Sequence, residues 1–455
     1  MGVRFGTDGI RGVANAELGA ELVLALGRAT ARALGTGPFL VGRDTRRSGP
    51  LLQAALSAGL ASEGADVVDL GVLPTPGVAW HCARRALPGA VVSASHNPFT
   101  DNGVKIFAPG GLKLPTAVEA VVESELDTLL GGAPLPGPAP GPRPAPRVGR
   151  LSSDPAAVGD YVDHLVGVLE GRDLGGMRVV VDGANGAAAA IAPEVLTRAG
   201  AVVSAVACEP DGTNINDGCG STHPERVAAE VRARGAEVGL ALDGDADRLV
   251  AVDHTGAPTT GDELLALFAV DLAGQGRLAG EAVVATVMSN LGFRRAMAER
   301  GITVRETPVG DRYVLEELAA AGLSLGGEQS GHLVFRDLAT TGDGVLTGLL
   351  LLDLLRRAGR SLAELAGEVM ARVPQVLVNV PAAQPVAVAE DPEVRAEVER
   401  TVAELGEQGR VLLRPSGTEP LVRLMVEASD EELAHRVTAR LRAVVERAAS
   451  PSRTP

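Results

Sequence analysis

The stretch MRVVVDGANGAAAAIAPEVLTRAGAVVSAV, residues 177–206, decides the fold class of this chain. It opens with a short valine-rich run, continues with a segment of helical periodicity, and closes with a second valine-rich run. A strand, a helix and a strand in this order are typical of α/β proteins. The stretch therefore predicts one α/β unit.

The same alternation continues on both sides of this stretch. Before it, helix-like segments alternate with strand-like ones at 19–35, 39–44, 48–64, 65–71 and 90–95. After it, a third unit begins near residue 258 and ends with a long helical stretch at 345–371, and a shorter unit follows with an acidic helix at 390–406. The pattern predicts three α/β units and a smaller α+β unit.

Residues 131–149, GGAPLPGPAPGPRPAPRVG, are rich in proline and glycine and lack periodicity. Such a composition is typical of a semi-rigid linker, so we expect the first domain boundary here. Together with the alternation of segments, this predicts four domains at residues 1–150, 151–256, 257–372 and 373–455.

Size and charge exclude several classes of protein. A chain of 455 residues is too long for one hydrophobic core. Its net charge of −15 argues against nucleic-acid binding, which needs a basic face, and no apolar run is long enough to span a membrane. The N-terminus has no signal-peptide pattern, and the three cysteines are far apart. We expect a cytoplasmic protein without a disulfide framework.

Residues 91–98, VVSASHNP, end a strand-like run with Ser95, His96 and a turn at Asn97-Pro98. The serine either caps the first turn of a following helix or is held at a strained corner for chemistry. The only two lysines of the chain, Lys105 and Lys113, follow this segment. Because lysine can give up a proton and arginine cannot, Lys105 is a candidate for proton transfer near Ser95.

The segment ALDGDADR, residues 241–248, contains the strongest metal-binding pattern. Asp243, Asp245 and Asp247 are spaced by two, so an extended segment would project all three carboxylates to one side. Three like charges favour a hard cation such as Mg²⁺, while a solvated acidic turn is the structural alternative. Apolar runs on both sides favour burial and hence the metal.

The segment RPSGTEP, residues 414–420, lies between two strand-like runs. Its Ser416-Gly417-Thr418 turn can offer backbone N–H groups and hydroxyls to an oxyanion, and Arg414 and Arg423 can add phosphate-binding forks. An ordinary hairpin is the alternative. No lysine follows a glycine anywhere in the chain, which excludes a nucleotide-binding P-loop.

Two further glycine-flanked segments contain candidate functional residues. GGEQSGH, residues 326–332, places Glu328, Ser330 and His332 two residues apart, so a carboxylate, a hydroxyl and an imidazole can face one ligand. FGTDGIRG, residues 5–12, is a similar turn and presents Arg11. Each residue alone could be structural, but a loop that holds all three polar groups favours ligand binding.

These segments together resemble the α-D-phosphohexomutases. SASHNP, DGDADR, GEQSGH and RPSGTEP occur in the family's order, one in each expected domain, and the resemblance covers essentially the whole chain. FGTDGIRG, NINDGCGSTHPE, VGDRYVLE and TTGDG resemble the branch that acts on glucosamine phosphates. Ala246 departs from many relatives, which have glycine there, and the linker is unusually rich in proline.

The resemblance implies three similar mixed-sheet α/β domains and a smaller C-terminal α+β domain around a central cleft. It also implies that phosphorylated Ser95 exchanges its phosphoryl group with a hexosamine phosphate through a glucosamine or glucose 1,6-bisphosphate. One Mg²⁺ per site would bind Asp243, Asp245, Asp247 and a phosphoserine oxygen. The other expected roles are transition-state stabilisation by Arg11 and Arg248, phosphoryl contact by His96, acid/base catalysis by Lys105 or His332, sugar recognition by Glu328 and Ser330, and phosphate binding by Arg414, Ser416, Gly417, Thr418 and Arg423.

Other interpretations of the same segments remain open. A phosphomannomutase or phosphoglucomutase could use the same scaffold, and a phosphatase could share the serine and the metal. A phosphatase would have no use for the second phosphate site at RPSGTEP. A non-catalytic sugar-phosphate sensor would be expected to lack Ser95, Lys105 or an aspartate, and all are present. We expect a monomer or a homodimer whose ligand is a small hexosamine phosphate.

Overall fold

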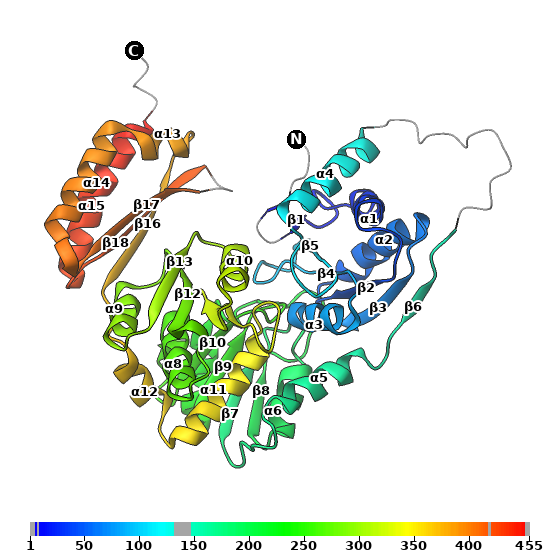
Figure 1. The fold of residues 1–455 in the computed structure, drawn as a ribbon, viewed down its shortest axis with the longest axis horizontal. Coiled ribbons are helices and arrows are strands. Elements are labelled where there is room, and N and C mark those ends of the chain that lie inside the picture. Colours follow the sequence, from blue (N-terminus) through cyan, green and yellow to red (C-terminus); the bar gives the residue numbers. More distant parts are fainter. Residues whose placement is uncertain (1–4, 7–8, 132–146, 417–419, 451–455) are drawn as a thin grey trace. The chain divides into compact units, whose positions relative to one another are not determined.

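A computed structural model describes residues 5–6, 9–131, 147–416 and 420–450 of the chain (Figure 1). The chain forms two compact units, one from residues 1–288 and 302–367 and the other from residues 289–301 and 368–455. Within the described residues, the first unit contains three sheets and the second contains one. None of the described helices is both long and apolar enough to cross a membrane.

The first sheet has the strand order β1-β5-β4-β2-β3-β6. Its strands are β1 (Ile10–Val13), β2 (Phe39–Arg43), β3 (Val67–Val72), β4 (Gly89–Val92), β5 (Asp101–Phe107) and β6 (Leu151–Ser153). β5 is antiparallel to β1 and β4, whereas β2 is parallel to β3 and β4, so the sheet is mixed. β6 lies just beyond residue 150 and pairs with β3.

Four helices pack on the two faces of this sheet: α1 (Ala20–Leu34), α2 (Gly49–Ser62), α3 (Thr75–Arg85) and α4 (Thr116–Leu130). Figure 1 shows α1, α2 and α4 on one face and α3 on the other. Alternate residues of β2, Phe39 and Val41, belong to the core beneath α1, α2 and α4. α1 and α2 touch at glycines, since a Cβ at Gly59 would lie 2.1 Å from the carbonyl oxygen of Leu24.

The second sheet contains the stretch 177–206, which folds as the predicted strand, helix and strand. The sheet order is β11-β10-β9-β7-β8, with β7 (Arg178–Asp182), β8 (Val202–Val206), β9 (Val238–Leu242), β10 (Leu249–Asp253) and β11 (Pro258–Thr259). β7 is parallel to β8 and β9, and β10 returns antiparallel to β9. The helices of this region are α5 (Ala157–Gly167), α6 (Ile191–Arg198) and α7 (Pro224–Arg234).

The third sheet has the order β13-β12-β14-β15, with β12 (Ala282–Thr286), β13 (Thr303–Thr307), β14 (Leu325–Gly327) and β15 (Leu333–Phe335). The helices of this part of the chain are α8 (Gly261–Gly274), η1 (Ala279–Glu281), α10 (Asp311–Ala321), α11 (Gly344–Ala358) and α12 (Leu362–Val369). α8 and α10 pack against this sheet, whereas α11 packs against β9 and β10 of the second sheet. The prediction of one long helix at 345–371 is wrong. Gly359, with φ +63°, ends α11 in the left-handed conformation, and α12 starts anew.

The second unit contains an antiparallel sheet of order β16-β18-β17. Its strands are β16 (Gln375–Pro381), β17 (Arg410–Pro415) and β18 (Leu421–Glu427), and its helices are α9 (Leu291–Glu299), α13 (Pro385–Glu390), α14 (Pro392–Leu405), η2 (Gly406–Gln408) and α15 (Glu431–Ala449). The predicted acidic helix is α14, which Asp391 caps by accepting backbone N–H groups of its first turn.

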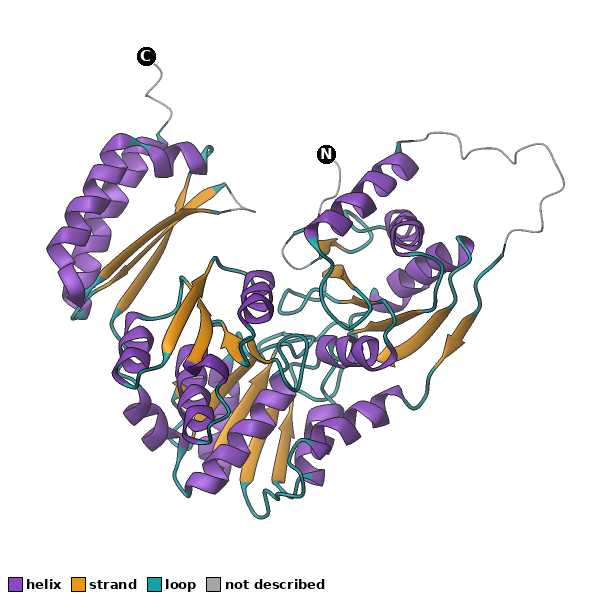
Figure 2. Ribbon diagram, in the orientation of Figure 1, coloured by secondary structure: helices purple, strands orange, loops and turns teal. Residues whose placement is uncertain are grey.

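Figure 2 shows helices packed against every sheet. Three mixed sheets with helices and one small antiparallel sheet with helices confirm the predicted fold class of three α/β domains and a smaller α+β domain. The predicted central cleft stays a prediction.

Candidate active site

Ser95 lies in the loop between β4 and β5, completely buried and with φ +53°. A non-glycine residue rarely adopts this left-handed conformation, which costs roughly 1 kcal/mol or more. No helix follows, because the chain turns back into the antiparallel strand β5. Ser95 is therefore the serine of a strained corner and does not cap a helix.

Hydrogen bonds hold all three polar groups of Ser95. Its N–H donates to Ser93 Oγ at 3.1 Å, and its carbonyl accepts from Arg46 and from Asn216, both at 2.9 Å. Its Oγ donates to Asp243 Oδ2 at 2.5 Å. These contacts compensate for the backbone strain and direct the hydroxyl at the acidic loop.

Arg46 is a positioning residue that the sequence analysis missed. Although its side chain is fully buried, its guanidinium donates to the carbonyls of Ser95, Asn97, Pro98 and Asp101 and pairs with Asp44. A buried charge needs such complete pairing. The available signal was the segment GRDTR, in which charged residues directly follow a buried strand.

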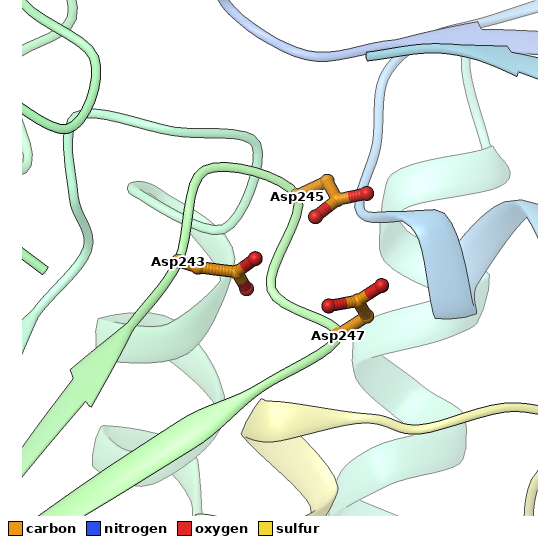
Figure 3. A group of neighbouring side chains, drawn as sticks. All are labelled: Asp243, Asp245 and Asp247. Atoms are coloured by element: carbon orange, nitrogen blue, oxygen red, sulfur yellow. The ribbon is translucent and has the colours of Figure 1, made fainter. Parts of the chain in front are cut away.

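Asp243, Asp245 and Asp247 lie in the loop between β9 and β10 (Figure 3). All three are buried, and one oxygen of each carboxylate lies within 4.8 Å of those of the others. The loop is a turn and not the extended segment we expected, because Ala246 adopts φ +56°. Burial and the neighbouring Asp247 and Asp245 charges raise the pKa of Asp243 well above its ordinary value.

Groups from other elements surround this acidic cluster. Lys105, on β5, places its Nζ 2.8 Å from Asp245 Oδ2 and 3.3 Å from Asp247 Oδ2. Thr75, the first residue of α3, donates its hydroxyl to Asp245 Oδ2 at 2.6 Å, a contact that no sequence motif indicates. The structure thus brings the predicted Lys105 to the predicted metal ligands.

Three further predicted residues lie around Ser95. His96 Nδ1 is 3.4 Å from both Ser95 Oγ and Arg248 Nη1, and Arg11 Nη1 donates to Asn97 Oδ1 at 3.2 Å. Burial, followed by the positive charges of Arg248 and Arg11, lowers the pKa of His96 to about 4. His96 is therefore neutral near pH 7, and two guanidinium groups flank the serine loop.

The loop between β14 and β15 holds Glu328, Ser330 and His332. Glu328 Oε1 accepts the N–H of Gly310 at 3.0 Å, and Ser330 Oγ donates to Glu328 Oε2 at 3.4 Å. His332 Nδ1 lies 3.8 Å from Asp247 Oδ1, so this loop adjoins the acidic cluster. Burial acts to lower the pKa of His332, but its hydrogen bond and charge interaction with Asp247 raise that pKa overall.

In the second unit, Arg414 on β17 and Arg423 on β18 are directly opposite partners. Like charges at opposed positions of an antiparallel pair are destabilising, and an anion between them would relieve the repulsion. Ser416 N–H donates to the carbonyl of Leu421 at 2.9 Å and closes the hairpin end. Gly417 and Thr418 lie outside the described residues.

The acidic cluster meets the requirements of a hard divalent cation. Its ligand atoms are all carboxylate oxygens, which suit Mg²⁺. Asp245 Oδ1 is buried and accepts no hydrogen bond from the described residues, as expected for an oxygen that serves a metal. The residues present could therefore hold a metal ion next to a buried serine hydroxyl.

Four family models match the chain, described as phosphoglucomutase/phosphomannomutase α/β/α domains I, II and III and C-terminal domain. They cover residues 2–130, 159–256, 260–373 and 377–444, respectively. Together they account for most of the chain, in the order of the four sheets.

Curated relatives are similar over almost their entire length. A phosphoglucosamine mutase from Saccharopolyspora erythraea is 53% identical over 97% of this chain and 98% of its own, and one from Salinispora arenicola is 52% identical over 99% and 100%.

Solved structures show the same fold. A phosphoglucomutase/phosphomannomutase family protein from Burkholderia thailandensis has a TM-score of 0.83 at 27% identity and covers 99% of both chains. An Aspergillus fumigatus N-acetylphosphoglucosamine mutase in complex with GlcNAc-6P and magnesium has a TM-score of 0.71 at 18% identity over 99% of this chain and 96% of its own.

Proposed function

Because the chain belongs to the phosphoglucomutase/phosphomannomutase family and, within it, to the phosphoglucosamine mutases, we propose the following roles for its residues. The protein is an enzyme of the isomerase class that interconverts glucosamine 6-phosphate and glucosamine 1-phosphate. The roles of single residues, the metal and the intermediate are our proposal.

Ser95 carries the phosphoryl group. The P–O bond to Ser95 Oγ breaks while a new P–O bond forms to the free hydroxyl of the bound sugar phosphate. The proton of that hydroxyl returns to Ser95 Oγ, so the product is a 1,6-bisphosphate and no further reactant is needed. Reversal with the other phosphate regenerates phosphoserine. The buried Oγ, 2.5 Å from Asp243 and held at φ +53°, is the observation that supports this role most directly.

Mg²⁺ fits the oxygens of Asp243, Asp245 and Asp247, joined by a phosphoserine oxygen. The bound ion supplies positive charge where phosphoryl transfer develops negative charge. Arg11 and Arg248, which adjoin the serine loop, add positive charge, and His96, neutral because of its lowered pKa, contacts the phosphoryl group as a neutral partner.

Lys105 is the better candidate for acid/base catalysis than His332. His332 Nε2 accepts the N–H of Gly342 at 3.1 Å, which places the ring proton on Nδ1, the nitrogen that faces Asp247. Both ring nitrogens are thus directed at protein groups. Lys105 has an ammonium with several protons and lies among the carboxylates beside the serine loop.

The remaining residues recognise the parts of the ligand that do not react. Glu328 and Ser330 bind sugar hydroxyls, and the opposed Arg414 and Arg423, with Ser416, Gly417 and Thr418, bind the phosphate that is not being transferred. Such a site favours a mutase over a phosphatase, which releases its single phosphate.

We further propose four domains at residues 1–150, 151–256, 257–372 and 373–455, and a cytoplasmic setting. Cys82, Cys208 and Cys219 are free thiols, and burial raises the pKa of each above its ordinary value. Unreactive free thiols suit a reducing compartment. The enzyme acts as a monomer or homodimer.

The test is Ser95→Ala. After incubation of the wild type with glucose 1,6-bisphosphate, intact-mass spectrometry should detect one phosphate group on the protein. Ser95→Ala should lose both this phosphate and all turnover of glucosamine 6-phosphate, because the acceptor oxygen is gone. Ser57→Ala, which removes a buried hydroxyl on α2, is the matched control and should keep both. Turnover by the Ser95→Ala protein would exclude the phosphoserine mechanism.

A further inference from the structure

We propose that Asp311 recognises the amine on C2 of the sugar and so sets the preference for glucosamine phosphates over glucose phosphates. The inference rests on the proposed function of Glu328 as a reader of sugar hydroxyls. The amine is the group that distinguishes glucosamine from glucose, and none of the residues assigned above binds it.

Asp311 is the first residue of α10 and is connected to the acidic cluster through His332 and to Glu328 through the preceding Gly310. Its Oδ2 pairs with Lys113 Nζ and is 3.9 Å from His332 Nε2, whose ring faces Asp247 on the other side. The adjacent Gly310 donates its N–H to Glu328 Oε1. Because C2 is bonded to C3, a carboxylate next to the residue that reads the C3 hydroxyl is well placed for the C2 amine.

The other carboxylates of this region have different partners. The triad aspartates surround the metal site, and Glu328, which accepts the N–H of Gly310 and the hydroxyl of Ser330, is assigned to the sugar hydroxyls. Asp311 Oδ1 accepts the N–H of Arg312 at 2.8 Å. A carboxylate can accept about four hydrogen bonds, so Asp311 retains capacity for an ammonium.

Charge balance favours an amine at this position. Asp311 and Glu328 have two negative charges, against the one positive charge of Lys113. His332 Nε2, 3.9 Å from Asp311 Oδ2, accepts the N–H of Gly342 and so presents no proton to this carboxylate. The ammonium of glucosamine phosphate would bring a second positive charge to these carboxylates, whereas the neutral hydroxyl of glucose phosphate would not. Arg312 does not change this sum, since it forms a two-bond ion pair with Glu119.

The counter-ion of Asp311 is a lysine in a chain that otherwise uses arginine for positive charge. A guanidinium presents a fork that matches both oxygens of a carboxylate, whereas an ammonium is a compact point charge. Lys113 pairs with Oδ2, while Oδ1 accepts the N–H of Arg312. The chemistry of the pair is thus compatible with a second cation.

The experiment is Asp311→Asn, with kcat/KM measured for glucosamine 6-phosphate and glucose 6-phosphate. Asparagine retains an oxygen that can accept the N–H of Arg312, so α10 should keep its first turn. The variant loses the charge-assisted hydrogen bond between Asp311 and the ammonium on C2. This loss should lower kcat/KM for glucosamine 6-phosphate about ten- to hundredfold. The value for glucose 6-phosphate should stay within about threefold of the wild type, because its hydroxyl needs no anion.

Glu317→Gln is the matched control, since it also replaces a carboxylate on α10, where Glu317 pairs with Arg305. It should leave the ratio of the two kcat/KM values unchanged. Equal losses for both sugars in Asp311→Asn would show a general structural role and overturn the inference, as would an unchanged ratio. A wild type inactive on glucosamine 6-phosphate would instead contradict the proposed function, so the two failures are distinguishable.

Discussion

At the scale of single residues, the site depends on a buried cation that contacts no reacting atom. Arg46 binds four carbonyls of the serine loop, and Asn216 binds two of the same carbonyls. Both side chains act on backbone groups, and they hold Ser95 in a conformation that an isolated loop would rarely adopt. Arg46 and Asn216 therefore set the orientation of the Ser95 hydroxyl, although neither contacts it.

Arg46→Lys tests this support. Lysine keeps the charge and much of the length but replaces a planar fork by one ammonium, so it cannot bind four carbonyls at once. We expect kcat to fall roughly a hundredfold, as for loss of two charged hydrogen bonds of about 1.5 kcal/mol each, while KM changes little. Arg47→Lys, at an exposed neighbouring position, is the control and should behave like the wild type. A rise in KM with unchanged kcat would contradict a role in positioning Ser95.

The sequence predicts the residues that bear the chemistry better than those that hold them. Ser95, Lys105 and the three aspartates stand out as residue types in short motifs, and the structure brings them together. Arg46, Asn216 and Thr75 act across 49, 121 and 170 residues of sequence. The segment GRDTR draws attention to Arg46, but contacts of this length leave no local pattern that identifies the partner, so only the fold reveals them.

At the scale of elements, helix α11 begins at a buried acid. Asp343 caps the helix by accepting the N–H of Leu346 at 2.9 Å, and it accepts the hydroxyl of Tyr161 at 2.5 Å from α5. Just before it, Gly342 donates to His332, and just after it, Gly344 donates to the carbonyl of Ala246. The start of α11 thus joins α5 to both loops of the site.

Asp343→Asn tests the electrostatics of this cap. Burial raises the pKa of Asp343 to about 6 in the folded protein, against 3.8 ordinarily. Between these values the folded state binds a proton that the unfolded state has lost, so this contribution to stability is present at low pH and decreases as pH rises. Two pKa units correspond to about 3 kcal/mol. From pH 4 to pH 7, the thermal midpoint of the variant should therefore rise relative to that of the wild type.

Asp430 provides the control for this experiment. It also caps a helix, α15, but at the surface, where hydrogen bonding to the N–H of Leu433 lowers its pKa. Asp430→Asn should show no relative gain in thermal midpoint with rising pH. A pH-independent difference between Asp343→Asn and the wild type would show that the buried carboxyl does not titrate in this range.

The sequence predicts elements better than their arrangement. Apolar runs and helical periodicity predict the bounds of β2, α1 and α2 to within two residues. The run at 345–371, by contrast, contains no proline that would indicate the end of α11 at Gly359. Strand β5, which follows the serine loop, went unpredicted because polar Asp101 and Asn102 open it. The order of strands in each sheet depends on long-range pairing and has no local signal.

At the scale of the whole molecule, the acidic cluster belongs to one compact unit and the opposed arginines belong to the other. Each ligand should therefore stabilise only the unit that contains its binding residues. A ligand present at 100 times its dissociation constant stabilises the folded state by about 2.7 kcal/mol.

Magnesium removal and Asp245→Asn test this selectivity. In calorimetry of the full chain, added Mg²⁺ should raise the midpoint of the transition of the unit with residues 1–288 and 302–367 by several degrees, because the ion binds the folded cluster alone. The chelator EDTA should reverse the shift, and Asp245→Asn should abolish it. Asp217→Asn, at an exposed carboxylate of the same unit, should keep it. A full magnesium shift in Asp245→Asn would place the metal elsewhere.

The long separations between interacting residues also govern when the enzyme becomes active during its synthesis. Ser95 contacts an aspartate 148 residues later in the chain, and Tyr161 contacts one 182 residues later. At about 5–20 residues per second, roughly 7 to 30 seconds separate the synthesis of Ser95 from that of Asp243. The ribosome therefore delivers the nucleophile well before any of the carboxylates that surround it. A nascent chain consequently has no working phosphoryl-transfer centre before Asp247 has been made, and helix α11, whose first turn adjoins both loops of the site, follows later still.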